Sequence, residues 1–150
     1  MEFLIIKQMA IALIIGMMIG LQREMHYHKK KEISFAGTRT FALIALLGYL
    51  SAWIQSFSPL FLVVSLAIFG LIVLVSYIIK TTQGAYHGAT TEIAALITFI
   101  LGVMLFFSLD AYAISLAIVM LFLLEIKGDI SRIEEHITTQ DLSSMTLFLS

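Results

Sequence analysis

Five apolar stretches, each close to the length of a membrane-spanning helix, fill most of this 150-residue chain. A helix needs about 20 apolar residues to cross the hydrocarbon core of a bilayer, within a range of roughly 17 to 25. The chain is 60% hydrophobic and 13% charged, far from the roughly 25% of charged residues in soluble domains. The pattern predicts an all-α, polytopic transmembrane bundle of about five spans, at residues 3–21, 41–57, 60–79, 93–109 and 111–126.

Local signals at the ends of these stretches support the division. The first apolar run is followed, not preceded, by basic residues, which indicates a retained helix rather than a cleaved signal peptide. Ser58 and Pro59 predict a tight turn between the second and third spans, and Asp110 is a plausible cap between the fourth and fifth. The fourth and fifth spans are short, so we expect them to recruit flanking residues or to thin the bilayer locally.

The positive charges are unevenly distributed between the span ends. Lys7 stands on one side, whereas the other side holds Arg23, Lys29, Lys30, Lys31, Arg39, Lys80, Lys127 and Arg132. Because basic residues in short loops are retained in the cytoplasm, we expect the N-terminus outside and the C-terminus in the cytoplasm. The stretch HYHKKK, residues 26–31, is interpreted as a solvated linker that sets this orientation.

Several kinds of chemistry lack a sequence signal. The chain has no cysteine, and no nucleophile–base arrangement or phosphate-binding glycine loop is recognisable. His26, His28 and His87 lack a metal-binding spacing, and solvated side chains are the favoured interpretation. We therefore expect neither an enzymatic activity nor a nucleic-acid partner.

The predicted topology gathers ionisable residues at one membrane face. Arg23 and Glu24 end the first span, Arg39 begins the second, Glu92 begins the fourth and Glu125 closes the fifth. Charges near hydrocarbon are costly unless paired, so Arg39 is expected to fork onto a carboxylate such as Glu24 or Glu92. Two interpretations stay open, an ion-pair cluster that fixes helix ends and a functional cavity. The candidate ion or gating site consists of Arg23, Glu24, Arg39, Thr40, Thr91 and Glu92.

Small residues predict where helices approach closely. Gly16 and Gly20 form a G-x-x-x-G pattern, the spacing that lets helix backbones touch in a bilayer. Gly84 and Gly88 break the helical pattern before Thr90 and Thr91, which can cap a helix whose first turn carries Glu92. The candidate packing residues are Gly16, Gly20, Gly37, Gly48 and Gly102.

Two motifs carry a resemblance to a known family. GMMIGLQRE, residues 16–24, and AGTRTFALIALLG, residues 36–48, resemble the hallmark of the MgtC/SapB family of bacterial membrane proteins. Gln22 and Thr38 depart from the pattern, which usually has an acidic residue and a leucine there. The matching residues are Gly20, Arg23, Glu24, Gly37, Arg39, Thr40 and Leu43.

The later segment GATTEIAALITFILG, residues 88–102, is more similar to a long branch of that family, in which an MgtC-like half precedes a second membrane domain. The resemblance implies a transmembrane domain at residues 1–130. It also implies a cytoplasmic linker with the start of a further helix at residues 131–150.

For function, the resemblance implies an inner-membrane protein linked to magnesium or other cation homeostasis. One hypothesis is a transporter or channel-like module in which Glu24 and Glu92 are the candidate residues that bind the metal ion. Mg²⁺ would then be a bound ligand or the transported substrate, and we expect no other cofactor. The alternative is a non-transporting regulatory subunit that binds another membrane protein. Either hypothesis admits the lipid bilayer and a second copy of the chain as partners.

Overall fold

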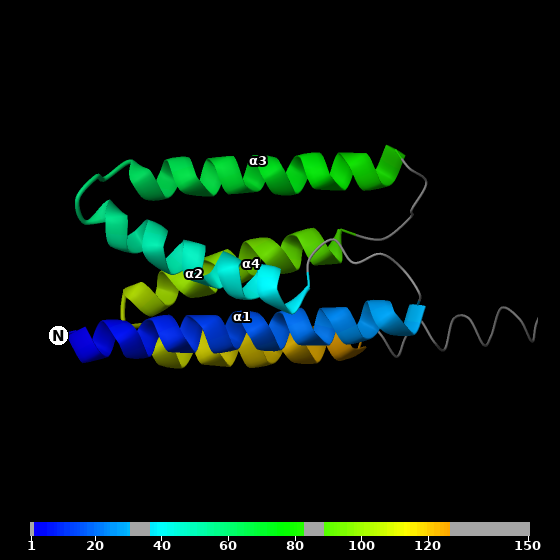
Figure 1. The fold of residues 1–150 in the computed structure, drawn as a ribbon, viewed down its shortest axis with the longest axis horizontal. Helices are drawn as coiled ribbons and strands as arrows, with labels where there is room; N and C mark the ends of the chain where they lie inside the picture. Colours follow the sequence, from blue (N-terminus) through cyan, green and yellow to red (C-terminus); the bar gives the residue numbers. More distant parts are fainter. Residues whose placement is uncertain (1, 31–36, 83–88, 127–150) are drawn as a thin grey trace, which may run out of the picture.

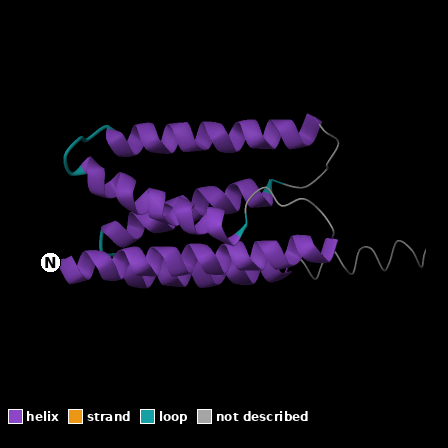
Figure 2. Ribbon diagram, in the orientation of Figure 1, coloured by secondary structure: helices purple, strands orange, loops and turns teal. Residues whose placement is uncertain are grey.

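The chain folds into helices throughout the part that the computed structural model describes, residues 2–30, 37–82 and 89–126, with residues 26–30 described by their backbone alone. This part contains no strand (Figure 2). The predicted all-α fold is therefore confirmed, and each predicted apolar stretch overlaps one helix. The helices are α1 (Glu2–Lys30), α2 (Thr38–Gln55), α3 (Phe61–Thr82), α4 (Thr90–Phe106) and a further helix at residues 110–126.

Two helices are long and apolar enough to cross a membrane by length and composition. They are the Glu2–Met25 part of α1 and the whole of α3. The helix α4 is apolar but shorter.

Successive helices run in opposite directions along the bundle (Figure 1). The 110–126 helix lies parallel to α1, because Gln8 bonds to Ser108 and Gln22 bonds to Leu121, so both helices advance together. We call the end that holds the last turn of α1 and the first turns of α2 and α4 the basic end. The opposite end, which holds residues 56–60 and 107–109, is called the turn end.

The core lies where α1, α2 and α4 meet. A methyl group at Gly16 would lie 2.5 Å from the Phe41 carbonyl oxygen, so α1 contacts the backbone of α2 directly. Gly48 on α2 and Gly102 on α4 are in still closer contact, each with the backbone of the other helix. In a lipid bilayer the hydrophobic effect does not hold helices together, so the dispersion contacts made at such close approach stabilise the helix pairs instead. The helix α3 packs on the outside of this core, against α2 and α4.

Three local expectations need correction. Residues 26–30, assigned to a solvated linker, continue α1, because the residues after Leu21 include no helix breaker. The N-cap of α4 is Ala89 rather than a threonine, so Thr91 lies within the first turn. The last helix begins at Asp110 itself, so Asp110 is not the capping residue before it, and its Oδ1 is buried without a hydrogen-bond partner.

Other expectations concern residues that lie outside the described ranges. They are Lys31, Gly84, His87, Gly88, Lys127, Arg132 and the proposed linker at 131–150. The side chains of His26, His28, Lys29 and Lys30 likewise lie outside the description.

A candidate ion-pair site at the basic end

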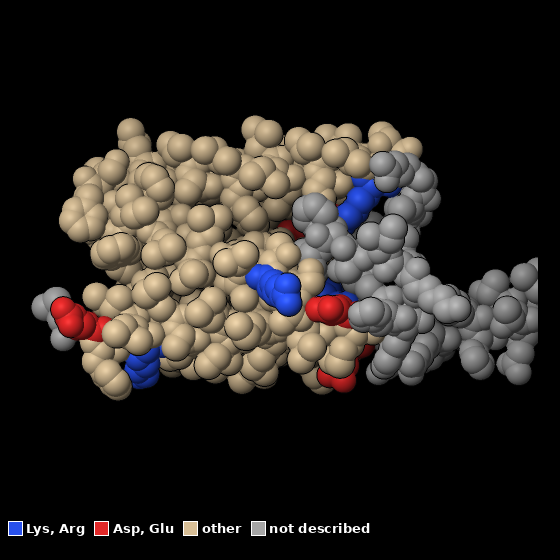
Figure 3. Space-filling view, viewed as in Figure 1, with Lys and Arg blue, Asp and Glu red and all other residues tan. Residues whose placement is uncertain are grey.

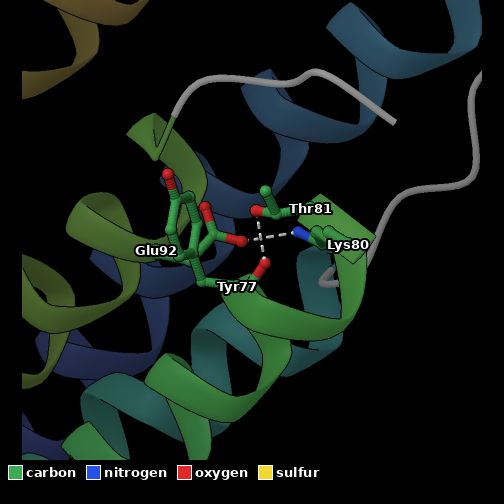
Figure 4. Close-up of polar contacts among 4 residues, drawn as sticks. All are labelled: Tyr77, Lys80, Thr81 and Glu92. Carbon is green, nitrogen blue, oxygen red and sulfur yellow. Dashed lines mark hydrogen bonds and ion pairs between the residues drawn. The ribbon is translucent and has the colours of Figure 1, made fainter. Parts of the chain in front are cut away.

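The basic end holds an ion pair between α3 and α4 (Figure 4). Lys80 Nζ donates a hydrogen bond to Glu92 Oε1 at 2.7 Å. The Glu92 side chain is 7% exposed and the Lys80 side chain 25% exposed, so the carboxylate is the more deeply buried partner. Beside the pair, the Thr81 hydroxyl donates to the Tyr77 carbonyl within α3 at 2.9 Å. A buried carboxylate in an apolar bundle needs an oppositely charged partner, and Lys80 is that partner for Glu92.

The helical repeat of α3 explains how Lys80 reaches this position. The buried residues of α3 are Phe69, Val73 and Ser76. Lys80 continues the same stripe, because residues spaced by three or four lie on one helix face. Glu92 lies in the first turn of α4, where the helix dipole favours a negative charge. The stripe on α3 and the start of α4 therefore bring opposite charges together.

A second polar contact joins α1 to the beginning of α2. Glu24 Oε2 accepts hydrogen bonds from the Thr38 backbone N–H at 3.2 Å and from the Thr38 hydroxyl at 2.7 Å. The N-cap residue of α2 is Gly37, whose lack of a side chain leaves no capping group of its own. A methyl group at Gly37 would lie 3.3 Å from Glu24 Oε2, so glycine also leaves room for this carboxylate.

The remaining predicted site residues divide between the interior and the surface. Arg23 is 6% exposed and Thr91 is 2% exposed, so both lie inside the bundle. Arg39 and Thr40 are exposed, because α2 turns Phe41 toward the core and these two positions away from it. Among the described residues Arg39 makes no ion pair with a carboxylate. The arginine expected beside Glu92 is thus replaced by Lys80.

Among the side chains that the structure describes at this end, the buried and half-buried charges are balanced. Arg23 and Lys80 carry two positive charges, and Glu24 and Glu92 carry two negative ones. Both carboxylates have protein partners, the Lys80 ammonium for one and Thr38 for the other. In the described ranges, no group of three His, Asp or Glu side chains is placed to hold a metal ion. A cation at Glu92 Oε1 would therefore have to exchange with the Lys80 ammonium.

A polar chain at the turn end was not anticipated from the sequence. The Tyr49 hydroxyl donates to Gln8 Oε1 at 3.2 Å, and Gln8 Nε2 donates to the Ser108 hydroxyl at 3.2 Å. Gln8 is 3% exposed and Tyr49 is 1% exposed. Gln8 within the first apolar stretch was the sequence signal for this contact, since burying a glutamine side chain in a bilayer costs free energy unless it is hydrogen-bonded. These two hydrogen bonds join α1, α2 and the turn at residues 107–109 at the end of the bundle opposite the ion pair.

Ser108 has an unusual backbone for a residue that is not glycine. Its φ is 58°, which is the left-handed region. The next residue, Leu109, donates its N–H to the Met104 carbonyl at 3.1 Å, which is the bond that closes a Schellman motif after α4. Glycine usually takes this position. Serine adds a hydroxyl that accepts a hydrogen bond from the Gln8 amide. This bond explains why a serine replaces the usual glycine.

Fold and site together define a class of protein. Large apolar residues are exposed along the helices, and on the face in Figure 3 most charged atoms lie in the half near the basic end, with the rest at the N-terminal end. Apolar surface between two polar ends is the arrangement of a helical membrane protein. More particularly, residues 9–133 match the MgtC family, and the chain belongs to that family. The comparisons with curated proteins and with solved structures found no match.

Proposed function

We propose that the chain is a multi-pass protein of the bacterial inner membrane that serves cation homeostasis by binding a divalent cation at Glu92, as a transporter or channel-like module. The observation that carries this proposal is the Lys80–Glu92 pair, whose carboxylate is buried. Ionisable groups inside membrane helices are rare and commonly mark ion pathways. Mg²⁺ keeps several waters and needs one or two carboxylates, so Glu92 at the rim of the bundle is a chemically adequate ligand.

The proposed topology has five spans, the turn end outside and the basic end in the cytoplasm. Trp53 and Tyr112 are exposed near the turn end, where aromatic residues commonly mark the membrane interface. The basic residues near the other end fit the cytoplasmic side. The helix α4 has 17 residues, or about 25 Å at 1.5 Å per residue, so the bilayer is expected to thin beside it.

The proposal is tested by measuring Mg²⁺ uptake into liposomes that contain the purified full chain. We expect the wild-type protein to move Mg²⁺ and Glu92→Gln to abolish the flux at equal protein incorporation. Glu125→Gln is the matched control, because Glu125 is exposed on the 110–126 helix. The absence of flux for Mg²⁺, other cations and protons in wild-type liposomes would rule out transport.

A second candidate is a non-transporting regulatory subunit that binds another membrane protein. The observation that favours it is that Glu24 and Glu92 both already have protein partners, as in an ion-pair cluster that only fixes helix ends. This candidate predicts a specific partner, or a second copy of the chain, after gentle detergent extraction and crosslinking. Recovery of the monomeric chain with lipid alone would count against it.

We propose neither an enzymatic step nor a nucleic-acid partner for either candidate. The connections at residues 56–60 and 107–109 are too short to hold an active site. The bilayer itself is the common partner, because most of the surface of α3 is apolar and exposed.

A further inference from the structure

We propose that the Lys80 ammonium is a tethered counter-cation that competes with the bound cation for Glu92, so that cation binding releases the basic end of α3 from α4. This inference rests on the proposed cation site. It adds a competitor that sets the affinity of the site and a helix that responds to its occupation.

The geometry makes the two occupants mutually exclusive at one oxygen. Lys80 Nζ lies 2.7 Å from Glu92 Oε1, whereas a directly bound metal cation lies about 2.0 to 2.6 Å from its oxygen ligands. An ion bound to Oε1 from this side would therefore overlap the ammonium and repel its charge. Lys80 can leave along its own stem, because its side chain is 25% exposed at the end of α3.

The attachment of α3 makes this exchange consequential. One narrow stripe of α3 is buried, at Phe69, Val73 and Ser76, while the other faces are largely exposed. Phe69 stacks on Phe99 of α4 with ring centroids 5.3 Å apart, which holds the middle of the helix. Toward the basic end the stripe continues with Ser76, whose buried hydroxyl has no hydrogen-bond partner, and then with Lys80.

The ion pair therefore ties the last turns of α3 to the first turn of α4. Helices in lipid have no hydrophobic drive to stay together, so the loss of a polar contact there is not compensated by exclusion of water. By linkage, a ligand that replaces Lys80 favours the detached position of α3, and detachment favours the ligand.

The first test measures Mg²⁺ binding to the purified full chain by titration calorimetry, with Mg²⁺ as the only ligand. We expect Lys80→Gln to bind Mg²⁺ about tenfold more tightly than wild type, which is within the usual range of site coupling. Glu92→Gln should not bind at this site. If Lys80→Gln folds poorly, Lys80→Arg carries the test, because a guanidinium holds a carboxylate bidentately and should weaken Mg²⁺ binding several-fold. Unchanged or tighter binding by Lys80→Arg, or no gain by Lys80→Gln, would overturn the proposal.

The second test reports the position of α3. Because the chain has no native cysteine, Ser76→Cys introduces a single thiol, at a position that is 8% exposed. We expect Mg²⁺ to raise its rate of reaction with a small thiol reagent at least threefold, and Lys80→Gln to raise it without Mg²⁺. Ser51→Cys is the matched control, since Ser51 on α2 is also buried and its hydroxyl is also unpartnered.

The two tests separate this inference from the function on which it rests. Mg²⁺ flux that depends on Glu92, with a Ser76→Cys reaction rate that does not respond to Mg²⁺ or to Lys80→Gln, overturns the inference and leaves the cation site standing. No flux and no Mg²⁺ binding by wild type or by Lys80→Gln overturns both.

Discussion

The Glu24 carboxylate on α1 caps the N-terminus of α2 through Thr38. Its Oε2 accepts both the Thr38 backbone N–H, at 3.2 Å, and the Thr38 hydroxyl, at 2.7 Å. The first N–H groups of a helix have no partner within the helix, and here another helix provides one. The motifs GLQRE and GTRT thus meet in space, and this contact fixes how α2 begins relative to α1.

Removing the hydroxyl of this cap should destabilise the bundle. We expect Thr38→Val to lower the free energy of unfolding by about 1.5 to 3 kcal/mol, the usual range for a hydrogen bond to a charged group. Thr40→Val, at an exposed neighbouring position, should change it by less than about 0.5 kcal/mol. Unfolding by titration with a denaturing detergent measures both. Equal stabilities of the two variants would show that the cap contributes nothing measurable.

The contact between α2 and α4 should not tolerate a methyl group. A methyl group at Gly48 would collide with the Phe99 carbonyl oxygen, and one at Gly102 with the Ala45 carbonyl oxygen. Because these obstacles are backbone atoms, we expect Gly48→Ala and Gly102→Ala each to destabilise the fold by about 1 to 3 kcal/mol, through overpacking.

The control for these variants is Gly70 on α3, which has nothing within 4 Å of the position of an added methyl group. Gly70→Ala should be neutral or stabilise the fold by up to about 1 kcal/mol, because alanine favours a helix more than glycine does. Thermal unfolding in one detergent compares the three variants. If Gly70→Ala is the most damaging, the packing account is wrong.

The sequence predicts helices and their polar ends better than it predicts which polar groups meet. Hydropathy locates each helix because the requirement for apolar length acts on local sequence. The partner of Glu92 instead depends on how α3 and α4 are rotated about their axes. Arg39 has the charge and the bidentate geometry for a carboxylate, yet the register of α2 turns it outward. Lys80 was the residue to choose, since it continues the buried stripe that begins at Phe69.

The polar chain at the turn end should show a modest but specific coupling. We expect Tyr49→Phe to destabilise the fold by about 1 kcal/mol, since it leaves the buried Gln8 Oε1 without its donor. In a double-mutant cycle with Gln8→Leu, the coupling energy should be near 0.6 kcal/mol, as for other hydrogen bonds between membrane helices. Tyr112→Phe is the control, because Tyr112 is 67% exposed. Additive effects of the Tyr49 and Gln8 changes would contradict the bond.

Gln22 departs from the acidic residue usual in the related motif, and its contacts explain why an acid is unsuitable here. Gln22 Nε2 donates to the Leu121 carbonyl at 3.0 Å and so ties α1 to the 110–126 helix. A carboxylate cannot donate this bond, and Gln22→Glu would place a negative charge against a carbonyl oxygen. We expect a loss of about 2 to 4 kcal/mol in the free energy of unfolding. Gln22→Leu should cost less, because it also removes Oε1, which is buried without a partner. Hydrogen exchange should show faster opening of residues 110–126 in Gln22→Glu than in Gln22→Leu, and equal rates would contradict this role.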